Sequence, residues 1–139
     1  MKSTKIKSII AAIAMLFVGA TTTYAQHHVG EVGKGPHGGT IQEADPNHAE
    51  ILIKDNMVYV YILDGDAKPV SNKGITGKAT LQFKDGHTVI ANLKAEGTDG
   101  FMIDNANAAT YSNCIVTAKV NGKSVSAKFK NYGAVKPKQ

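Results

Sequence analysis

Apolar and polar residues alternate with a period of two along most of the chain, and this alternation constrains the fold more than any other feature. Successive side chains of a β-strand point to opposite faces, so the pattern predicts strands with one buried face. No segment after the first 25 residues carries the i, i+3, i+4, i+7 apolar spacing of an amphipathic helix. The predicted strands cover residues 48–54, 57–63, 75–83, 88–95, 101–103, 110–120 and 125–129.

Turn residues between these segments indicate antiparallel hairpins. Asp55-Asn56, Asp85-Gly86 and Asn121-Gly122 each separate two alternating segments, and such pairs favour tight two-residue turns. Seven or eight short strands in about 100 residues predict an all-β fold, an antiparallel β-sandwich or small barrel. An immunoglobulin-like sandwich is our first choice. The chain has no Trp and a single Cys, so the term describes the architecture only.

Composition divides the chain into four segments. The first has the order of a secretory signal peptide, with three early lysines, an apolar run over residues 9–20 and small residues before a cleavage position after Ala25. A flexible arm rich in His and Gly follows, because that stretch offers almost nothing to bury. The segments are the signal peptide (1–25), the arm (26–39), the β-sandwich domain (40–130) and a polar tail (131–139).

Export, charge and cysteine content limit the expected partners. The apolar run is too short for a stable membrane span, and no Cys lies directly after the cleavage position, so we expect a periplasmic or secreted protein without a lipid anchor. Without the three leader lysines, 13 basic residues stand against 11 acidic ones, a net charge of +2. This weak, scattered charge argues against nucleic-acid binding. We expect a monomer that is not an enzyme, because no catalytic motif is visible.

Four of the five histidines lie early in the mature chain, and imidazole is a common ligand for Cu, Zn and Ni. Cleavage after Ala25 leaves His28 as the third residue, behind Gln26 and His27. The new amine, two backbone amides and this imidazole supply the four square-planar nitrogens that Cu(II) and Ni(II) prefer. Cyclisation of Gln26 would remove the free amine, and with it this set of four nitrogen ligands. An arm whose histidines bind nothing is an equally good interpretation.

A second group of candidate ligands lies where the arm meets the first strands. His37 is followed by two glycines that allow a sharp turn, while His48 and Glu50 share one face of a predicted strand. This face is too apolar to be fully exposed, so either the arm or a partner covers it. If the arm folds back, His37, His48, Glu50 and Met57 converge, and the Met57 thioether suits Cu(I). A face closed by more β structure, with His37 an ordinary turn residue, is the alternative.

A two-residue turn also predicts the cross-strand partners on this face. Two tyrosines lie on it, which suggests a different function. In this alternative the chain is a non-catalytic interaction module that binds a protein or a glycan through Leu52, Tyr59 and Tyr61. The predicted pairs are Glu50 with Tyr61, Leu52 with Tyr59 and Lys54 with Met57.

Four short motifs together resemble a pattern found in small exported bacterial proteins: PHGG at 36–39, HAEI at 48–51, VYVYILD at 58–64 and KPV at 68–70. The pattern is similar to the N-terminal β-domain of periplasmic adaptor subunits of cobalt-zinc-cadmium-type heavy-metal efflux pumps. The likeness covers residues 35–70 well and continues loosely to Phe129. It implies heavy-metal association in the periplasm, with His37, His48 and Glu50 as ligands. The adaptors' helical hairpin and lipoyl-type segments are missing, which implies a stand-alone or accessory module of an efflux system.

These observations predict an exported protein that binds a transition-metal ion, Cu first and Zn or Ni next, for buffering or handover in heavy-metal homeostasis. Because only neutral imidazole binds a metal, binding should weaken as the pH falls below about 6. The expected ligands are His27, His28, His37, His48, Glu50 and Met57.

Overall fold

A computed structural model describes residues 32–131 of the chain, so the predicted signal peptide, the start of the arm and nearly all of the tail lie outside the described residues. Nine strands and one short 3-10 helix occur within this range. They are β1 (Val32–Lys34), β2 (Thr40–Ala44), β3 (Asn47–Lys54), β4 (Met57–Leu63), β5 (Thr76–Gln82), β6 (Thr88–Glu96), β7 (Gly100–Ile103), η2 (Ala108–Thr110), β8 (Asn113–Val120) and β9 (Lys123–Lys130).

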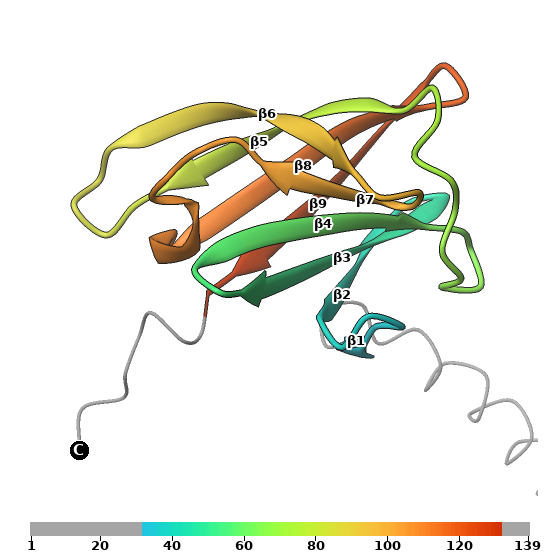
Figure 1. The fold of residues 1–139 in the computed structure, drawn as a ribbon, viewed down its shortest axis with the longest axis horizontal. Helices are drawn as coiled ribbons and strands as arrows, with labels where there is room; N and C mark the ends of the chain where they lie inside the picture. The colour runs from blue at the N-terminus through green and yellow to red at the C-terminus, as the bar shows by residue number, and fades with distance from the viewer. Residues whose placement is uncertain (1–31, 132–139) are drawn as a thin grey trace, which may run out of the picture.

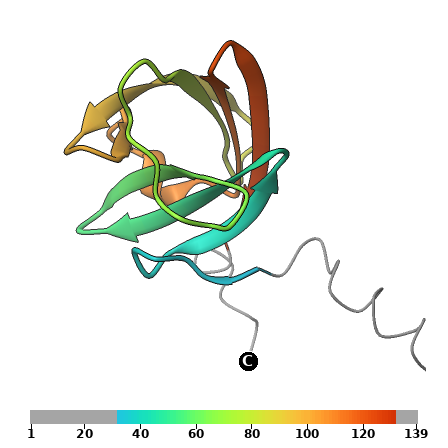
Figure 2. The same cartoon turned by 90° about the vertical axis from the view of Figure 1, so that its right-hand side faces the viewer.

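The strands form one curled sheet in the order β1-β2-β3-β4-β7-β6-β5-β8-β9 (Figure 1). Every neighbouring pair is antiparallel. The curl brings β2 against β9, which Figure 2 shows from the end of the molecule. The predicted all-β antiparallel fold is therefore confirmed. Because the strands follow one continuous sheet, the two-sheet sandwich and the immunoglobulin-like topology are not confirmed.

Two of the predicted hairpin turns have the backbone that tight connections require. Asp55 and Asn56 have φ angles of 51° and 63°, and Asn121 and Gly122 have φ angles of 50° and 78°. Positive φ at both central residues is the type I′ geometry, whose twist matches that of the flanking strands. β3 and β4 consequently pair in the register predicted from the sequence.

The alternation of each strand places its apolar face in one core. In β9, for example, Val125, Ala127 and Phe129 are buried while the residues between them are exposed. Ile53 is an exception. It continues the inward series of β3 but is 41% exposed, because it lies one residue before the strand ends at the hairpin turn.

The last part of the predicted arm belongs to the sheet. Val32–Lys34 forms β1 and pairs with β2, so β1 and β2 both precede the seven segments predicted as strands. The segment was expected to be flexible because it has little to bury, but it gains the backbone hydrogen bonds of a β ladder instead. Residues 32–131 contain no helix that is both long and apolar enough to cross a membrane.

Candidate functional site

The chain after β1 folds back across the outer face of β3. The N–H of Gly38 donates to the carbonyl of Gly35 (2.9 Å), and the N–H of Gly35 donates to the carbonyl of Gly39 (2.8 Å). Gly38 has a φ of 87°, which glycine adopts without a steric penalty. This turn covers the end of the apolar face that holds Glu50 and Tyr61, while Leu52 and Tyr59 stay partly exposed. The part of the predicted arm within residues 32–131 provides this cover.

Glu50 lies under this turn with none of its side chain exposed. Its carboxylate accepts hydrogen bonds from the backbone N–H groups of His37 (3.0 Å) and Gly39 (2.8 Å) and from Nδ1 of the His37 ring (2.7 Å). A buried carboxylate without such partners would be strongly unfavourable. Ile41 and Leu63 are buried on the same outer face, so Glu50 is the polar centre of a small second core.

Two glycines allow the turn to approach Glu50 this closely. A Cβ atom on Gly35 would lie 2.3 Å from both Cδ and Oε2 of Glu50. A Cβ atom on Gly39 would lie 2.3 Å from the carbonyl oxygen of Ile51. Neither space accepts a methyl group, so the glycines are needed for close approach and not only for flexibility.

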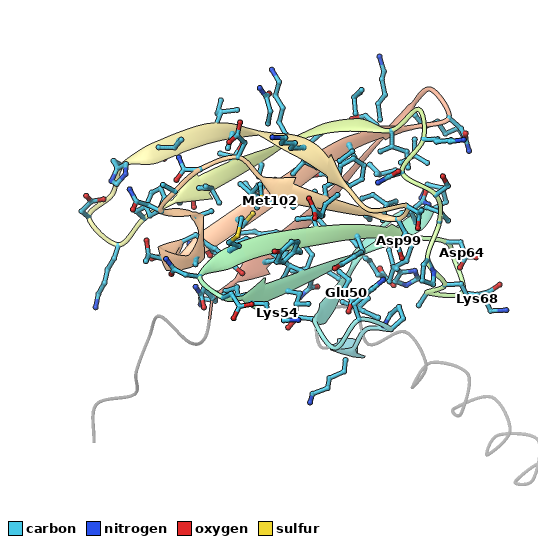
Figure 3. All side chains as sticks on the ribbon, in the orientation of Figure 1. Glu50, Lys54, Asp64, Lys68, Asp99 and Met102 are labelled. Atoms are coloured by element: carbon cyan, nitrogen blue, oxygen red, sulfur yellow. The ribbon has the colours of Figure 1, made fainter. Side chains whose placement is uncertain are left out.

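His37 connects the turn to a third part of the chain. Its Nε2 lies 2.9 Å from Oδ2 of Asp99, which follows β6, and its ring stacks on Tyr61 of β4 with 3.6 Å between centroids. Tyr61 pairs with both Glu50 on β3 and Gly100 on β7, which explains why these side chains meet. Glu50 and Asp99 lie at the same end of the molecule in Figure 3.

The two carboxylates determine the charge of the site. Burial alone would lower the pKa of His37, but the hydrogen bonds and negative charges of Glu50 and Asp99 outweigh it and raise the pKa above its ordinary value of 6.5. Burial, followed by the charges of Asp99 and Glu50, raises the pKa of Tyr61. These contacts therefore favour the protonated ring of His37 more than solvent does.

His48 lies beside this cluster. It is two residues before Glu50 on the same face of β3, and its Nδ1 donates to the carbonyl oxygen of Asp64 (3.0 Å). A hydrogen bond from Nδ1 places the lone pair of a neutral imidazole on Nε2. No group within residues 32–131 hydrogen-bonds to that Nε2 atom.

Met57 is not brought to the cluster. It pairs with Lys54 at the hairpin turn, four residues along β4 from Tyr61, which corresponds to about 13 Å. Its side chain is 39% exposed, and its Sδ accepts the Tyr59 O–H at 3.8 Å. The structure thus joins His37 to Glu50, places His48 nearby, and leaves Met57 apart. His27 and His28 lie outside the described residues.

Asp99 was not predicted as a ligand from the sequence, because it lies in the segment Gly97–Gly100, which has the composition of a turn. Its position depends on β7 pairing with β4, two strands that are far apart in the chain. Within residues 32–131, no group of three or more His, Cys, Asp and Glu side chains is arranged to hold a metal ion.

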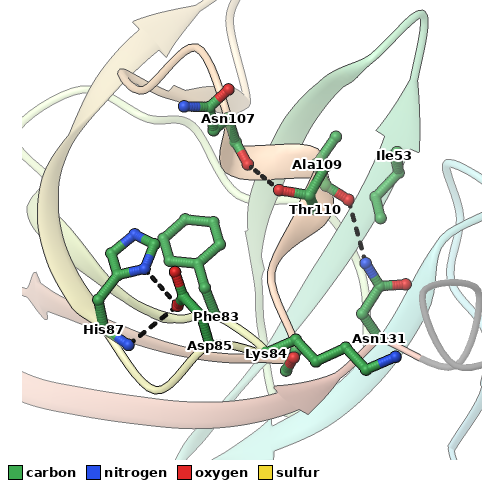
Figure 4. A pocket seen from close by; sticks show the side chains of 10 residues that line it. Ile53, Phe83, Lys84, Asp85, His87, Asn107, Ala109, Thr110 and Asn131 are labelled. Carbon is green, nitrogen blue, oxygen red and sulfur yellow. Dashed lines mark hydrogen bonds and ion pairs between the residues drawn. The ribbon is translucent and has the colours of Figure 1, made fainter.

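A cavity of about 790 Å³ lies nearer the β3–β4 turn, with Ile53, Phe83, His87 and Asn107 among its lining residues (Figure 4). The rings of Phe83 and His87 stack with 4.4 Å between centroids, and Asp85 accepts a hydrogen bond from His87. His87 is 55% exposed and lies between β5 and β6. None of the predicted ligands within residues 32–131 lines this cavity, so the His37 cluster is the candidate site.

The chain matches no protein-family model, no curated protein and no solved structure. The resemblance to efflux-pump adaptor domains therefore rests on the sequence motifs alone.

Proposed function

We propose that this chain is an exported protein that captures a transition-metal ion, Cu first and Zn or Ni next, through the imidazole of His37. The observation that carries the proposal is the 2.7 Å contact between Nδ1 of His37 and the fully buried carboxylate of Glu50. Metal-binding histidines usually donate their second ring N–H to a carboxylate, which orients the ring and makes its other nitrogen a better ligand.

Nε2 of His37 is the nitrogen that this arrangement presents to an ion. It points at Asp99, whose side chain is 34% exposed, and the His37 side chain is 22% exposed. An ion bound between Nε2 and the Asp99 carboxylate would replace the proton of the hydrogen bond that joins these two groups. Glu50 is better suited to orient the ring than to bind the metal, because its oxygens are already occupied by protein donors.

Two ligands are too few for a Cu or Zn site, so the proposal requires further donors. His27 and His28 are the nearest candidates in the sequence. Val32 pairs with Ile41, which pairs with Glu50, so Val32 lies about 10 Å from Glu50 across two strand spacings. The four residues from His28 to Val32 span up to about 14 Å, which exceeds the separation of Val32 from Glu50. His48 offers its Nε2 on the same face.

The test is calorimetric titration of the full mature protein with Cu(II), Zn(II) and Ni(II). We expect His37→Gln to weaken binding at least tenfold, and His27→Gln with His28→Gln to weaken it as well. His87→Gln is the matched control, because His87 also contacts a carboxylate but lies in an exposed turn. Circular dichroism of each variant shows whether it is folded. If folded His37→Gln binds each ion as tightly as the unmodified protein, the proposal is wrong.

The alternative, an interaction module that uses the face of Leu52, Tyr59 and Tyr61, has less support. The ring of Tyr61 is stacked under His37, so this face is smaller than the sequence suggested. A loss of partner binding in Tyr59→Ala with unchanged metal affinity would favour it.

A further inference from the structure

A gap opens in the sheet where β6 changes partners. β6 pairs with β5 only as far as Asn92, opposite Lys78, and from Leu93 onward it pairs with β7. β5 continues beyond this point to Thr76 and pairs there only with β8. Figure 1 shows the end of β6 turning toward β7 while β5 continues along β8. The start of β5 and the end of β6 therefore diverge, with no ladder between them.

This gap is a cavity of about 520 Å³ that runs from the core to the surface. The inward-facing residues at its inner end are apolar: Ile75, Leu93, Phe101 and Ala118. Its volume lies within the range of pockets that bind small ligands.

Two lysines line the outer end of the same cavity. Lys78 on β5 pairs with Thr117 on β8, and Lys119 is two residues farther along β8. Both lysines therefore lie on the outer face, at diagonal positions whose backbones are about 7–8 Å apart. Both side chains are exposed, and neither forms an ion pair with a carboxylate of residues 32–131. An anion between the two lysines would contact both positive charges.

The strands on one side of the cavity carry no acid, whereas on the other side Glu96 follows Ala95 at the end of β6. β5, β8 and β9 include no Asp or Glu, and β9 adds Lys128 and Lys130 to the outer face. The cavity thus has an apolar interior and a cationic opening on a basic face.

We propose that this cavity binds a fatty-acid carboxylate, with the acyl chain between β5 and β6 and the carboxylate between Lys78 and Lys119. A flexible acyl chain suits a narrow opening between two diverging strands, and its burial is favoured by the apolar lining. The carboxylate receives two charge-assisted contacts at the surface. This proposal does not depend on metal binding, because the cavity shares no residue with the His37 cluster.

The experiment is calorimetric titration of the full mature protein with decanoate and with decanol, which has the same chain without the charge. We expect decanoate to bind at one site and decanol to bind at least tenfold more weakly. Lys78→Gln and Lys119→Gln should each weaken decanoate binding about tenfold, the effect of losing one hydrogen bond to a charged group. Ala95→Leu, at an exposed position that lines the cavity, should block both ligands.

Lys128→Gln is the matched control, because Lys128 lies on the same basic face but does not line the cavity. It should leave decanoate affinity unchanged within about twofold. Equal binding of decanol, an equal loss in Lys128→Gln, or binding only to anionic phospholipid vesicles would each overturn the proposal. These substitutions are at exposed positions, and circular dichroism confirms that each variant is folded.

Discussion

Nδ1 of His37 lies 2.7 Å from Oε1 of Glu50, although the two residues are 13 positions apart in the chain. The contact fastens the turn after β1 to the outer face of β3. The His37 ring also contacts Asp99 and Tyr61, so one side chain connects four parts of the sheet. The stability of this end of the molecule and its proposed metal chemistry therefore depend on the same atoms.

The first prediction concerns the charge of Glu50. Glu50→Gln keeps the shape of the side chain but replaces a charged acceptor of three hydrogen bonds with one carbonyl oxygen and one N–H₂ donor. We expect the free energy of unfolding to fall by about 3 kcal/mol, because buried donors lose their partner. Urea denaturation measures it. Glu43→Gln, at an exposed position of β2, should change it by less than about 0.5 kcal/mol, and an equally small change in Glu50→Gln would contradict the prediction.

The second prediction uses two glycines of the same segment. Gly35→Ala places a Cβ atom 2.3 Å from the Glu50 carboxyl group, whereas Gly33→Ala meets nothing within 4 Å. Gly35→Ala should destabilise the protein by about 2 kcal/mol, because the turn must move away from Glu50. Gly33→Ala should have little effect. Thermal unfolding of both variants tests the contact, and equal melting temperatures would refute it.

Local features of the sequence predicted seven of the nine strands within residues 32–131, β3 to β9, but neither β1 nor β2. The period of two and the turn pairs predicted the β3–β4 hairpin, including the pairs Glu50–Tyr61 and Leu52–Tyr59. They also predicted that something must cover this face. These inferences succeed because a tight turn determines the register of the strands that it joins.

Contacts between distant segments were not predictable in the same way. Asp99 reaches His37 only because β7 inserts beside β4, and no local pattern specifies that pairing. The burial of Glu50 depends in turn on the path of the glycine turn. Met57 was grouped with the histidines because it shares their face, but residues on one face can still lie far apart along a strand.

The third prediction concerns Cys114, the single cysteine of the chain. It is fully buried on β8, and burial raises the pKa of its thiol to about 12. At pH 8 only about one thiol in 10⁴ would be ionised, and the thiolate is the reactive form. A disulfide exchange reagent should therefore not react with the native protein, but should react with one thiol in guanidinium chloride. Rapid reaction of the native protein would contradict this placement.

The fourth prediction follows from the raised pKa of His37. The folded protein binds this proton more tightly than the unfolded chain, so the stabilisation is fully present below about pH 6.5 and is lost as the pH rises through the folded-state pKa. The free energy of unfolding should fall over that range. In His37→Gln this part of the pH dependence should disappear. If the two proteins show the same pH dependence, the imidazolium does not contribute to stability.

The fifth prediction concerns the competition between this proton and the proposed metal ion for His37. An ion at Nε2 of His37 must displace the proton that Asp99 and Glu50 stabilise, so a raised pKa extends the competition to higher pH. As the solution is acidified, Zn(II) affinity should therefore begin to fall at a higher pH than it would for an ordinary histidine with a pKa of 6.5. Asp99→Asn removes one of the charges that raise the pKa, and it should shift this fall to lower pH while also weakening the site. Calorimetric titration between pH 6 and pH 8 measures both effects. A constant affinity across that range would show that His37 is not a ligand.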